Sequence, residues 1–344
     1  MAKKAKFPSE LRFDLVSKDW VLIATGRAKK PNLFKKEKTG QGKKEELSEK
    51  NCPFCIMNSQ EKPTLILNKG KKVSSSVIPE NWTTIVIPNK FPAVIPDPKL
   101  DERQEGPFFK KMNAVGFHEV VVTRDHQKSL GLLKTEEVRE VFDAYQQRYS
   151  ELMKKSFVNY VSIFHNHGKE AGASVFHPHS QIITTPLIDV DLNKALANSG
   201  DYFKKTGECI YCQMNEWERK AGKRLVFENE GFLAICPFAS KAAFEIIISP
   251  KKHLSCFENI TEKEKSQLAE AFKVSLNKLY KGLGNPAYNF YLHTAPCDDG
   301  KYPHYHWHWT ILPKTAAWAG FEIGTRIEIS TITPEKAAEY LREQ

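Results

Sequence analysis

Two cysteine pairs, each spaced as C-x-x-C, constrain this chain more than any other feature of its sequence. Cys52 and Cys55 form the first pair and Cys209 and Cys212 the second, in opposite halves of the 344 residues. Each half then continues in the same order, with a strand-like run, a histidine, a helical stretch, another strand-like run and a run of alternate histidines. Recurrence of a whole pattern in this order indicates duplication of one structural unit.

The separations between corresponding residues are nearly constant, at 126 or 127 residues. The matched pairs are His126 with His253, His177 with His304, and Thr135 with Thr261. Helices are expected over about 135–155 and 261–281, with a threonine at the N-cap of each, because a hydroxyl there accepts a hydrogen bond from the first turn. Glu264 completes a capping box with Thr261. A short final helix is expected after Thr333, with Pro334 in its first turn.

Runs rich in β-branched residues predict the strands. They cover residues 82–87, 118–123, 158–164, 244–249 and 288–293. The predicted fold is therefore α+β, with two tandem units in which antiparallel strands are crossed by one long helix. We expect the first unit to span residues 1–195 and the second 196–344, with the segment around 184–205 joining them.

The net charge of +10 comes from 51 Lys and Arg residues against 41 Asp and Glu residues. Much of this excess lies in the N-terminal quarter, without the interleaved aromatic residues or helix-turn-helix pattern of a nucleic-acid-binding protein. A small phosphorylated substrate is the better match for a locally basic cleft. No apolar run is long enough to span a membrane and no secretory signal is recognisable, so we expect a cytoplasmic protein without a membrane partner.

Seven cysteines in a chain without a secretory signal argue against a disulfide framework. A C-x-x-C turn supplies two thiolates to zinc, and each half adds two histidines. The predicted sets are Cys52, Cys55, His126 and His177, and Cys209, Cys212, His253 and His304. We expect two structural zinc sites, since four protein ligands leave no open position for catalysis. The alternative is that His126 and His253 are ordinary surface histidines.

The run His177-Pro178-His179-Ser180-Gln181 carries the candidate chemistry. In a strand, His177, His179 and Gln181 share one face. The preceding loop contains glycines that let backbone N–H groups approach phosphate oxygens, and an imidazole with a free nitrogen is a nucleophile toward phosphorus. The spacing alone is also compatible with metal ligands or core histidines.

Several segments together resemble the galactose-1-phosphate uridylyltransferase family, a branch of the histidine-triad superfamily built from two fused repeats. They are DWVLIATGRAKKP (19–31), CPFC (52–55), IPNKFPAV (87–94), VVVTRDHQKSL (120–130), NHGKEAGASVFHPHSQ (166–181) and GFEIGT (320–325). The resemblance runs nearly from end to end. It implies a dimeric enzyme in which each active site receives segments from both subunits.

The resemblance also assigns roles to individual residues. It implies that His179 is the nucleophile, that Gln181 and Ser174 contact phosphate, and that the first Cys and His set holds zinc. The implied substrate contacts are Arg27, Lys30, Phe54, Asn89, Phe164, Asn166, Gly172, Ala173, Phe321 and Glu322. The implied reaction moves UMP from UDP-glucose to galactose 1-phosphate through a uridylyl-histidine.

Some residues depart from the family pattern. Lys30 stands where an arginine is common, which replaces a bidentate fork by a point charge, and Arg326-Ile327-Glu328 is unexpected after the sugar-binding segment. The second C-x-x-C resembles ADP-glucose phosphorylase, so adenylyl transfer from ADP-glucose is the alternative activity. A nucleotide sensor without turnover is a further alternative, disfavoured by the intact His179 and Gln181. His306 is interpreted as the vestigial counterpart of His179.

Overall fold

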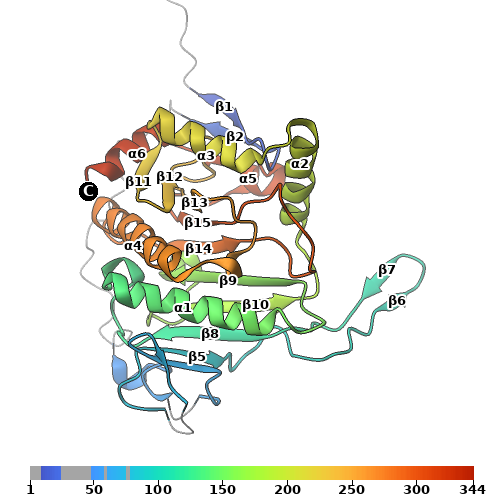
Figure 1. The fold of residues 1–344 in the computed structure, drawn as a ribbon, viewed down its shortest axis with the longest axis vertical. Helices are drawn as coiled ribbons and strands as arrows, with labels where there is room; N and C mark the ends of the chain where they lie inside the picture. The colour runs from blue at the N-terminus through green and yellow to red at the C-terminus, as the bar shows by residue number, and fades with distance from the viewer. Residues whose placement is uncertain (1–8, 25–47, 58–59, 75–77) are drawn as a thin grey trace, which may run out of the picture.

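The computed structural model describes residues 9–24, 48–57, 60–74 and 78–344, drawn as a ribbon in Figure 1. The strands are β1 (Glu10–Phe13), β2 (Trp20–Ile23), β3 (Leu65–Asn68), β4 (Lys71–Lys72), β5 (Thr84–Pro88), β6 (Arg103–Glu105), β7 (Phe109–Lys111), β8 (His118–Thr123), β9 (Tyr160–His167), β10 (His179–Thr185), β11 (Leu225–Glu228), β12 (Phe232–Ile235), β13 (Ile246–Pro250), β14 (Tyr288–His293), β15 (His308–Pro313) and β16 (Ile329–Ser330). The α-helices are α1 (Thr135–Leu152), α2 (Val190–Thr206), α3 (Ile210–Ala221), α4 (Glu262–Leu283), α5 (Gly320–Thr325) and α6 (Pro334–Arg342).

One continuous sheet of 11 strands joins the two halves of the chain, in the order β11-β12-β13-β15-β14-β9-β10-β8-β5-β3-β4. The central strands β9 and β14 are antiparallel, and β10 and β8 lie outside β9 as β15 and β13 lie outside β14. The arrangement therefore repeats about the β9–β14 pair. The predicted α+β fold with two tandem units is confirmed. The strands of the two units join edge to edge through β9 and β14 and form the single sheet.

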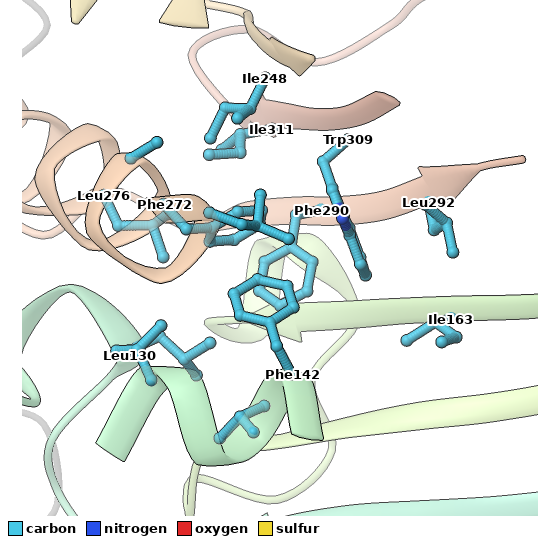
Figure 2. Packing of buried hydrophobic residues seen from close by; sticks show 14 of the residues in the cluster. Leu130, Phe142, Ile163, Ile248, Phe272, Leu276, Phe290, Leu292, Trp309 and Ile311 are labelled. Atoms are coloured by element: carbon cyan, nitrogen blue, oxygen red, sulfur yellow. The ribbon is translucent and has the colours of Figure 1, made fainter. Parts of the chain in front are cut away.

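The long helices α1 and α4 lie side by side across one face of this sheet (Figure 1). Their apolar sides bury a cluster of aromatic rings, shown in Figure 2. Phe272 of α4 lies 5.2 Å from Phe142 of α1 and 4.9 Å from Phe290 of β14, measured between ring centroids. Since burying one such side chain contributes about 1.5–3 kcal/mol, this cluster fastens both helices to the centre of the sheet.

The helix ends follow the sequence with one exception. Thr261 caps α4 and forms the expected box with Glu264, and the Thr333 hydroxyl accepts from the first turn of α6. Thr135, in contrast, is the first residue of α1, and the N-cap is Lys134. The Glu137 carboxylate accepts the Lys134 N–H at 2.7 Å, so acidic residues in the first turn replace the predicted threonine cap.

The opposite face of the sheet carries the candidate chemistry. On β10 the Ser180 hydroxyl accepts from Tyr145 of α1, and Ile182 belongs to the helix-side core. Because side chains alternate along a strand, His179 and Gln181 project to the face that α1 and α4 leave uncovered.

The predicted boundary between residues 195 and 196 falls inside α2. The repeated strands of the first unit precede α2 in the sequence, and those of the second unit follow it. A domain boundary between residues 195 and 196 stays a prediction. In the described part of the chain no helix is both long and apolar enough to cross a bilayer.

Candidate active site and metal clusters

His179 opens β10 with its imidazole held in one orientation. Its Nδ1 donates to the backbone carbonyl of His177 at 2.8 Å, because a carbonyl can only accept. Burial lowers the pKa of His179, and the bond to that carbonyl offsets part of this effect. The neutral ring therefore carries its lone pair on Nε2, which has no hydrogen-bond partner within the described residues.

Apolar and amide side chains surround His179. The Phe54 ring lies 4.9 Å from the His179 ring, centroid to centroid. Phe164 of β9 stands directly across from Gln181 in the strand register, and Asn166 lies two residues further along the same strand face. The structure thus brings five of the sequence-predicted residues to one place.

Gln181 is oriented by a residue that sequence reasoning missed. The Ala93 N–H donates to Nδ1 of His118 at 3.0 Å, so the proton of this imidazole sits on Nε2. That nitrogen lies 2.8 Å from Oε1 of Gln181 and 3.0 Å from Nδ2 of Asn89. With its oxygen accepting from His118, Gln181 presents its NH₂ group as a donor. The sequence signal that could have identified His118 is a polar residue at the start of a strand rich in β-branched residues, on the same strand face as Val120.

The loop between β9 and β10 depends on two glycines. Gly168 and Gly172 have φ values of +81° and +88°, which other residues adopt only with strain. A Cβ on Gly168 would also lie 2.9 Å from the Cβ of Ala287. The loop carries the predicted Ala173 and Ser174, and Ser174 is exposed. The N–H groups of Ala171 and Ala173 donate to the Gly168 carbonyl and that of Gly172 donates to the Lys169 carbonyl, so the two glycines close a tight turn that presents Ser174.

Asn289, from the second unit, forms hydrogen bonds that hold the same loop in place. This residue was not predicted from the sequence. Its Nδ2 donates to Oδ1 of Asn166 at 2.7 Å and to the carbonyl of Ala171 at 2.9 Å. The strand register sets Asn289 of β14 opposite Asn166 of β9. The second unit thus helps to shape the site of the first.

The first predicted metal set comes together. The donor atoms of Cys52, Cys55, His126 and His177 all lie within 4.8 Å of one another. Nδ1 of His177 is 3.5 Å and 3.4 Å from the two Sγ atoms, and its Nε2 donates to the carbonyl of Thr123 at 2.7 Å. That bond aims the Nδ1 lone pair at the thiols, as ligand histidines require. Two thiols and two imidazoles fit a tetrahedral zinc ion.

The second cluster corrects one prediction. It consists of Cys209, Cys212, His253 and His306, with donor atoms again within 4.8 Å. Nδ1 of His306 is 3.3 Å from Sγ of Cys212, and its Nε2 donates to the carbonyl of Pro250 at 2.8 Å. The predicted His304 contributes only its backbone carbonyl, 3.5 Å from Sγ of Cys209. His304 was therefore the wrong histidine for this cluster.

A loop-length difference explains the error. Asn166 precedes His177 by 11 residues, whereas its counterpart His293 precedes His306 by 13. His306 is thus the counterpart of His177 and not a vestigial copy of His179. The counterpart of His179 is His308, whose Nδ1 donates to the carbonyl of His306 at 3.1 Å.

Metal content tests this correction. We expect His306→Ala to lose the metal of the second cluster and His304→Ala to keep it, because His306 and not His304 adds a ring nitrogen to that of His253. Elemental analysis of the purified variants should find about one zinc per chain in the first and two in the second, as in the unchanged protein. The reverse pattern would restore the assignment made from sequence.

Two predicted substrate contacts are not brought to His179, and two others cannot be placed. Arg27 and Lys30 lie outside the described residues. Phe321 and Glu322 belong to the exposed helix α5, which Figure 1 shows beside the second unit and away from β10. Within a single chain, these two side chains do not complete the site.

Comparison with known proteins agrees with this geometry. The family described as galactose-1-phosphate uridyl transferase, N-terminal domain, matches residues 2–188, and its C-terminal domain matches residues 195–344. An ADP-glucose phosphorylase from Arabidopsis thaliana is 32% identical over 341 residues, covering 97% of this chain and 92% of that protein. A galactose-1-phosphate uridylyltransferase from Thermotoga maritima is 28% identical over 344 residues, covering 97% and 98%.

A solved structure shares the fold over nearly its whole length. The crystal structure of an ADP-glucose phosphorylase from Arabidopsis thaliana with bound ADP-glucose aligns with a TM-score of 0.80 and 28% identity. The alignment covers 98% of this chain and 99% of that one. The similarity therefore includes both units and the strands that carry His179.

Proposed function

The chain belongs to the galactose-1-phosphate uridylyltransferase family, and we propose that it moves UMP from UDP-glucose to galactose 1-phosphate through His179. The observation that carries the proposal is the buried neutral imidazole whose Nδ1 is bonded to the His177 carbonyl. This bond leaves Nε2 as the nucleophilic atom. The family match over both halves of the chain supports the substrate class.

The proposed reaction has two displacements at one phosphorus. Nε2 of His179 attacks the α-phosphorus of UDP-glucose, the P–O bond to glucose 1-phosphate breaks, and a uridylyl-histidine forms. A phosphate oxygen of galactose 1-phosphate then attacks the same phosphorus, and the P–N bond breaks to release UDP-galactose. Two in-line displacements give net retention at phosphorus. The His177 carbonyl stabilises the positive charge that the imidazole gains in the intermediate.

Gln181 and the loop between β9 and β10 are proposed to stabilise the negative charge that the phosphate oxygens carry in the transition state. With its Oε1 occupied by His118, Gln181 can only donate from its amide nitrogen. The exposed Ser174 would add a hydroxyl donor, whereas the N–H groups of Gly172 and Ala173 already donate to the carbonyls of Lys169 and Gly168 and hold the loop in shape. Donors fixed before the reaction stabilise developing charge without reorganisation.

Zinc is proposed as a structural ion in both clusters. Cys52, Cys55, His126 and His177 would hold one ion, and Cys209, Cys212, His253 and His306 the other. Zinc would link the four side chains of each cluster, and four protein ligands would leave no open position for substrate. The transfer steps above use only the protein's own side chains.

We further propose a cytoplasmic homodimer with shared active sites. α5 carries exposed Phe321 and half-buried Glu322, and it lies remote from β10 and His179 of the same chain. A second subunit could supply these two residues, together with Arg27 and Lys30, to the sugar phosphate. In this arrangement each active site would receive Phe321 and Glu322 from the partner subunit.

A second candidate is phosphorolysis of ADP-glucose by the same histidine. Two observations favour it, namely the complete second cysteine–histidine cluster and the 32% identity to the Arabidopsis thaliana ADP-glucose phosphorylase. The first displacement would then form an adenylyl-histidine. Both candidates share the nucleophile and differ in the base and the acceptor.

Labelling separates the two candidates. We expect protein incubated with UDP-glucose carrying ³²P at the α-phosphorus to retain label after denaturation, in an acid-labile and base-stable linkage. His179→Gly should retain none. Preferential labelling by α-³²P ADP-glucose would establish the second candidate, and labelling by neither would exclude covalent transfer.

A further inference from the structure

A cavity of about 990 Å³ opens on the substrate-side face of the second unit. Its floor is formed by strands of the sheet, and its walls come from α2, α3 and the segment 13–19. The floor residues include His308 and Thr310 of β15, Tyr291 and His293 of β14, and Glu245, which precedes β13. The nucleotidyl-transfer steps proposed above use none of these residues.

The floor of this cavity corresponds residue by residue to the candidate active site. Thr310 pairs with Tyr291 in the strand register as Gln181 pairs with Phe164. The Nδ1 of His308 donates to the carbonyl of His306, just as the Nδ1 of His179 donates to the carbonyl of His177. Its Nε2 likewise has no partner among the residues that the structure describes. The cavity is therefore the second unit's copy of the nucleotide site.

The neighbouring positions extend the correspondence. Ile246 of β13 pairs with Ile311, as Glu119 of β8 pairs with Ile182. The residue before each of these strand positions is Glu245 in the second unit and His118 in the first. A carboxylate thus replaces the imidazole that orients the phosphate-contacting glutamine.

Charge distinguishes the two sites. The lining of the cavity contains six acidic residues and three basic ones. Of the basic groups, Arg224 is paired with Glu218 at 2.9 Å and Lys194 with Asp19 at 2.6 Å. Lys241 lies 3.9 Å from Asp19 as well. A site with an excess of carboxylates and its cations already paired repels phosphate.

Two aromatic residues of the lining, Tyr211 and Tyr291, are only half-buried. The Tyr211 ring lies 5.7 Å from the His308 ring, and the buried Tyr305 ring packs against Tyr211 at 5.3 Å, between ring centroids. Rings of this kind offer stacking surface for a base. Carboxylates and hydroxyls at the floor can accept or donate hydrogen bonds to sugar hydroxyls. The volume lies within the range of small-molecule sites.

We propose that the second unit binds an uncharged nucleoside and discriminates against nucleotides. The proposal rests on the proposed function, since it takes the first site to be a nucleotide site. Loss of the phosphate-orienting pair His118 and Gln181, replaced by Glu245 and Thr310, leaves the base and ribose as the groups that this cavity can recognise.

Photolabelling of the full-length protein tests the proposal. Azido-uridine and azido-adenosine serve as probes, and peptide mapping identifies which unit is labelled. We expect label near Tyr211 or Tyr291 that is displaced at least about 10-fold more weakly by nucleoside 5′-monophosphates than by nucleosides, which is about 1.4 kcal/mol. Equal displacement by both, displacement by free glucose, or label confined to the first unit would overturn it.

Three helix variants make the test specific. Ala195 lines the cavity from α2, whereas Ala197 is an exposed residue of the same helix outside the lining. Ala195→Trp should abolish labelling of the second unit, and Ala197→Trp should leave it intact. Met214→Trp, from α3, provides a second blocking variant. Covalent labelling by UDP-glucose or ADP-glucose reports separately on His179, so failure of the proposed function would be distinguished from failure of this inference.

Discussion

Replacement of His179 by glycine is expected to lower the rate of nucleotidyl transfer by at least about 10⁴-fold. The covalent route requires a nitrogen lone pair at the α-phosphorus, and Nε2 of His179 is the atom that the structure leaves available. The measurement is the steady-state exchange between sugar nucleotide and sugar 1-phosphate. Folding should be normal, because the one hydrogen bond of the His179 side chain to a described residue is the bond to the His177 carbonyl, while the β10 backbone pairing does not depend on the side chain.

Imidazole added to His179→Gly gives this prediction a chemical control. The substitution leaves a space of ring size beside Phe54, and free imidazole placed there should attack UDP-glucose to form uridylyl-imidazole. His304→Gly is the matched variant, since that side chain is outside both metal clusters. It should keep full transfer. Near-normal transfer by His179→Gly without imidazole would show that another group is the nucleophile.

His177 lies two residues before His179, and the two histidines have different predicted roles. Its Nδ1 faces the thiols of the first cluster, and its Nε2 is bonded to the Thr123 carbonyl. His177→Gly should therefore lose metal and stability before it loses chemistry. A variant that stayed fully metallated and yet lost transfer would exchange the roles assigned to these two histidines.

Much of the fold could be predicted from the sequence because the signals were local. Runs of β-branched residues located β5, β8, β9, β13 and β14, and the capping box located the start of α4. The repeat predicted the two units. Edge-to-edge joining through β9 and β14 could not be predicted, because it depends on contacts between residues more than 100 positions apart.

The error at the second metal cluster has a specific cause. His304, His306 and His308 alternate along the chain, so a shift of two residues superposes histidine on histidine and preserves the strand face. Sequence spacing therefore could not reveal that the β14–β15 loop is two residues longer. Bonds from His306 to the Pro250 carbonyl and from His308 to the His306 carbonyl fix the register.

The site residues missed from sequence share one property. His118 and Asn289 act through other side chains, and each lies on a strand adjacent to the one that it supports. Such positions depend on strand register, which the sequence did not reveal. The roles of Arg27, Lys30, Phe321 and Glu322 stay predictions, since they require either residues outside the described ranges or a second subunit.

Loss of the first zinc ion is expected to have the largest effect on stability. Cys52→Ser should lower the free energy of unfolding by more than about 4 kcal/mol, because metal-binding energy is folding energy in a closed site. The cluster ties the segment around Cys52 to the end of β8 and to the loop that leads into β10. Denaturant unfolding together with elemental analysis measures both effects.

Two variants separate metal loss from thiol loss and from loss of the second ion. Cys256→Ser removes a thiol that is outside both clusters and should change stability by about 1 kcal/mol or less. Cys209→Ser should cost stability and one zinc but retain transfer where the protein is folded. Cys52→Ser should in addition impair substrate binding, because Phe54 lies between the two ligand cysteines and against the His179 ring. Unchanged stability with a full zinc complement in Cys52→Ser would mean that the first cluster does not hold a structural ion.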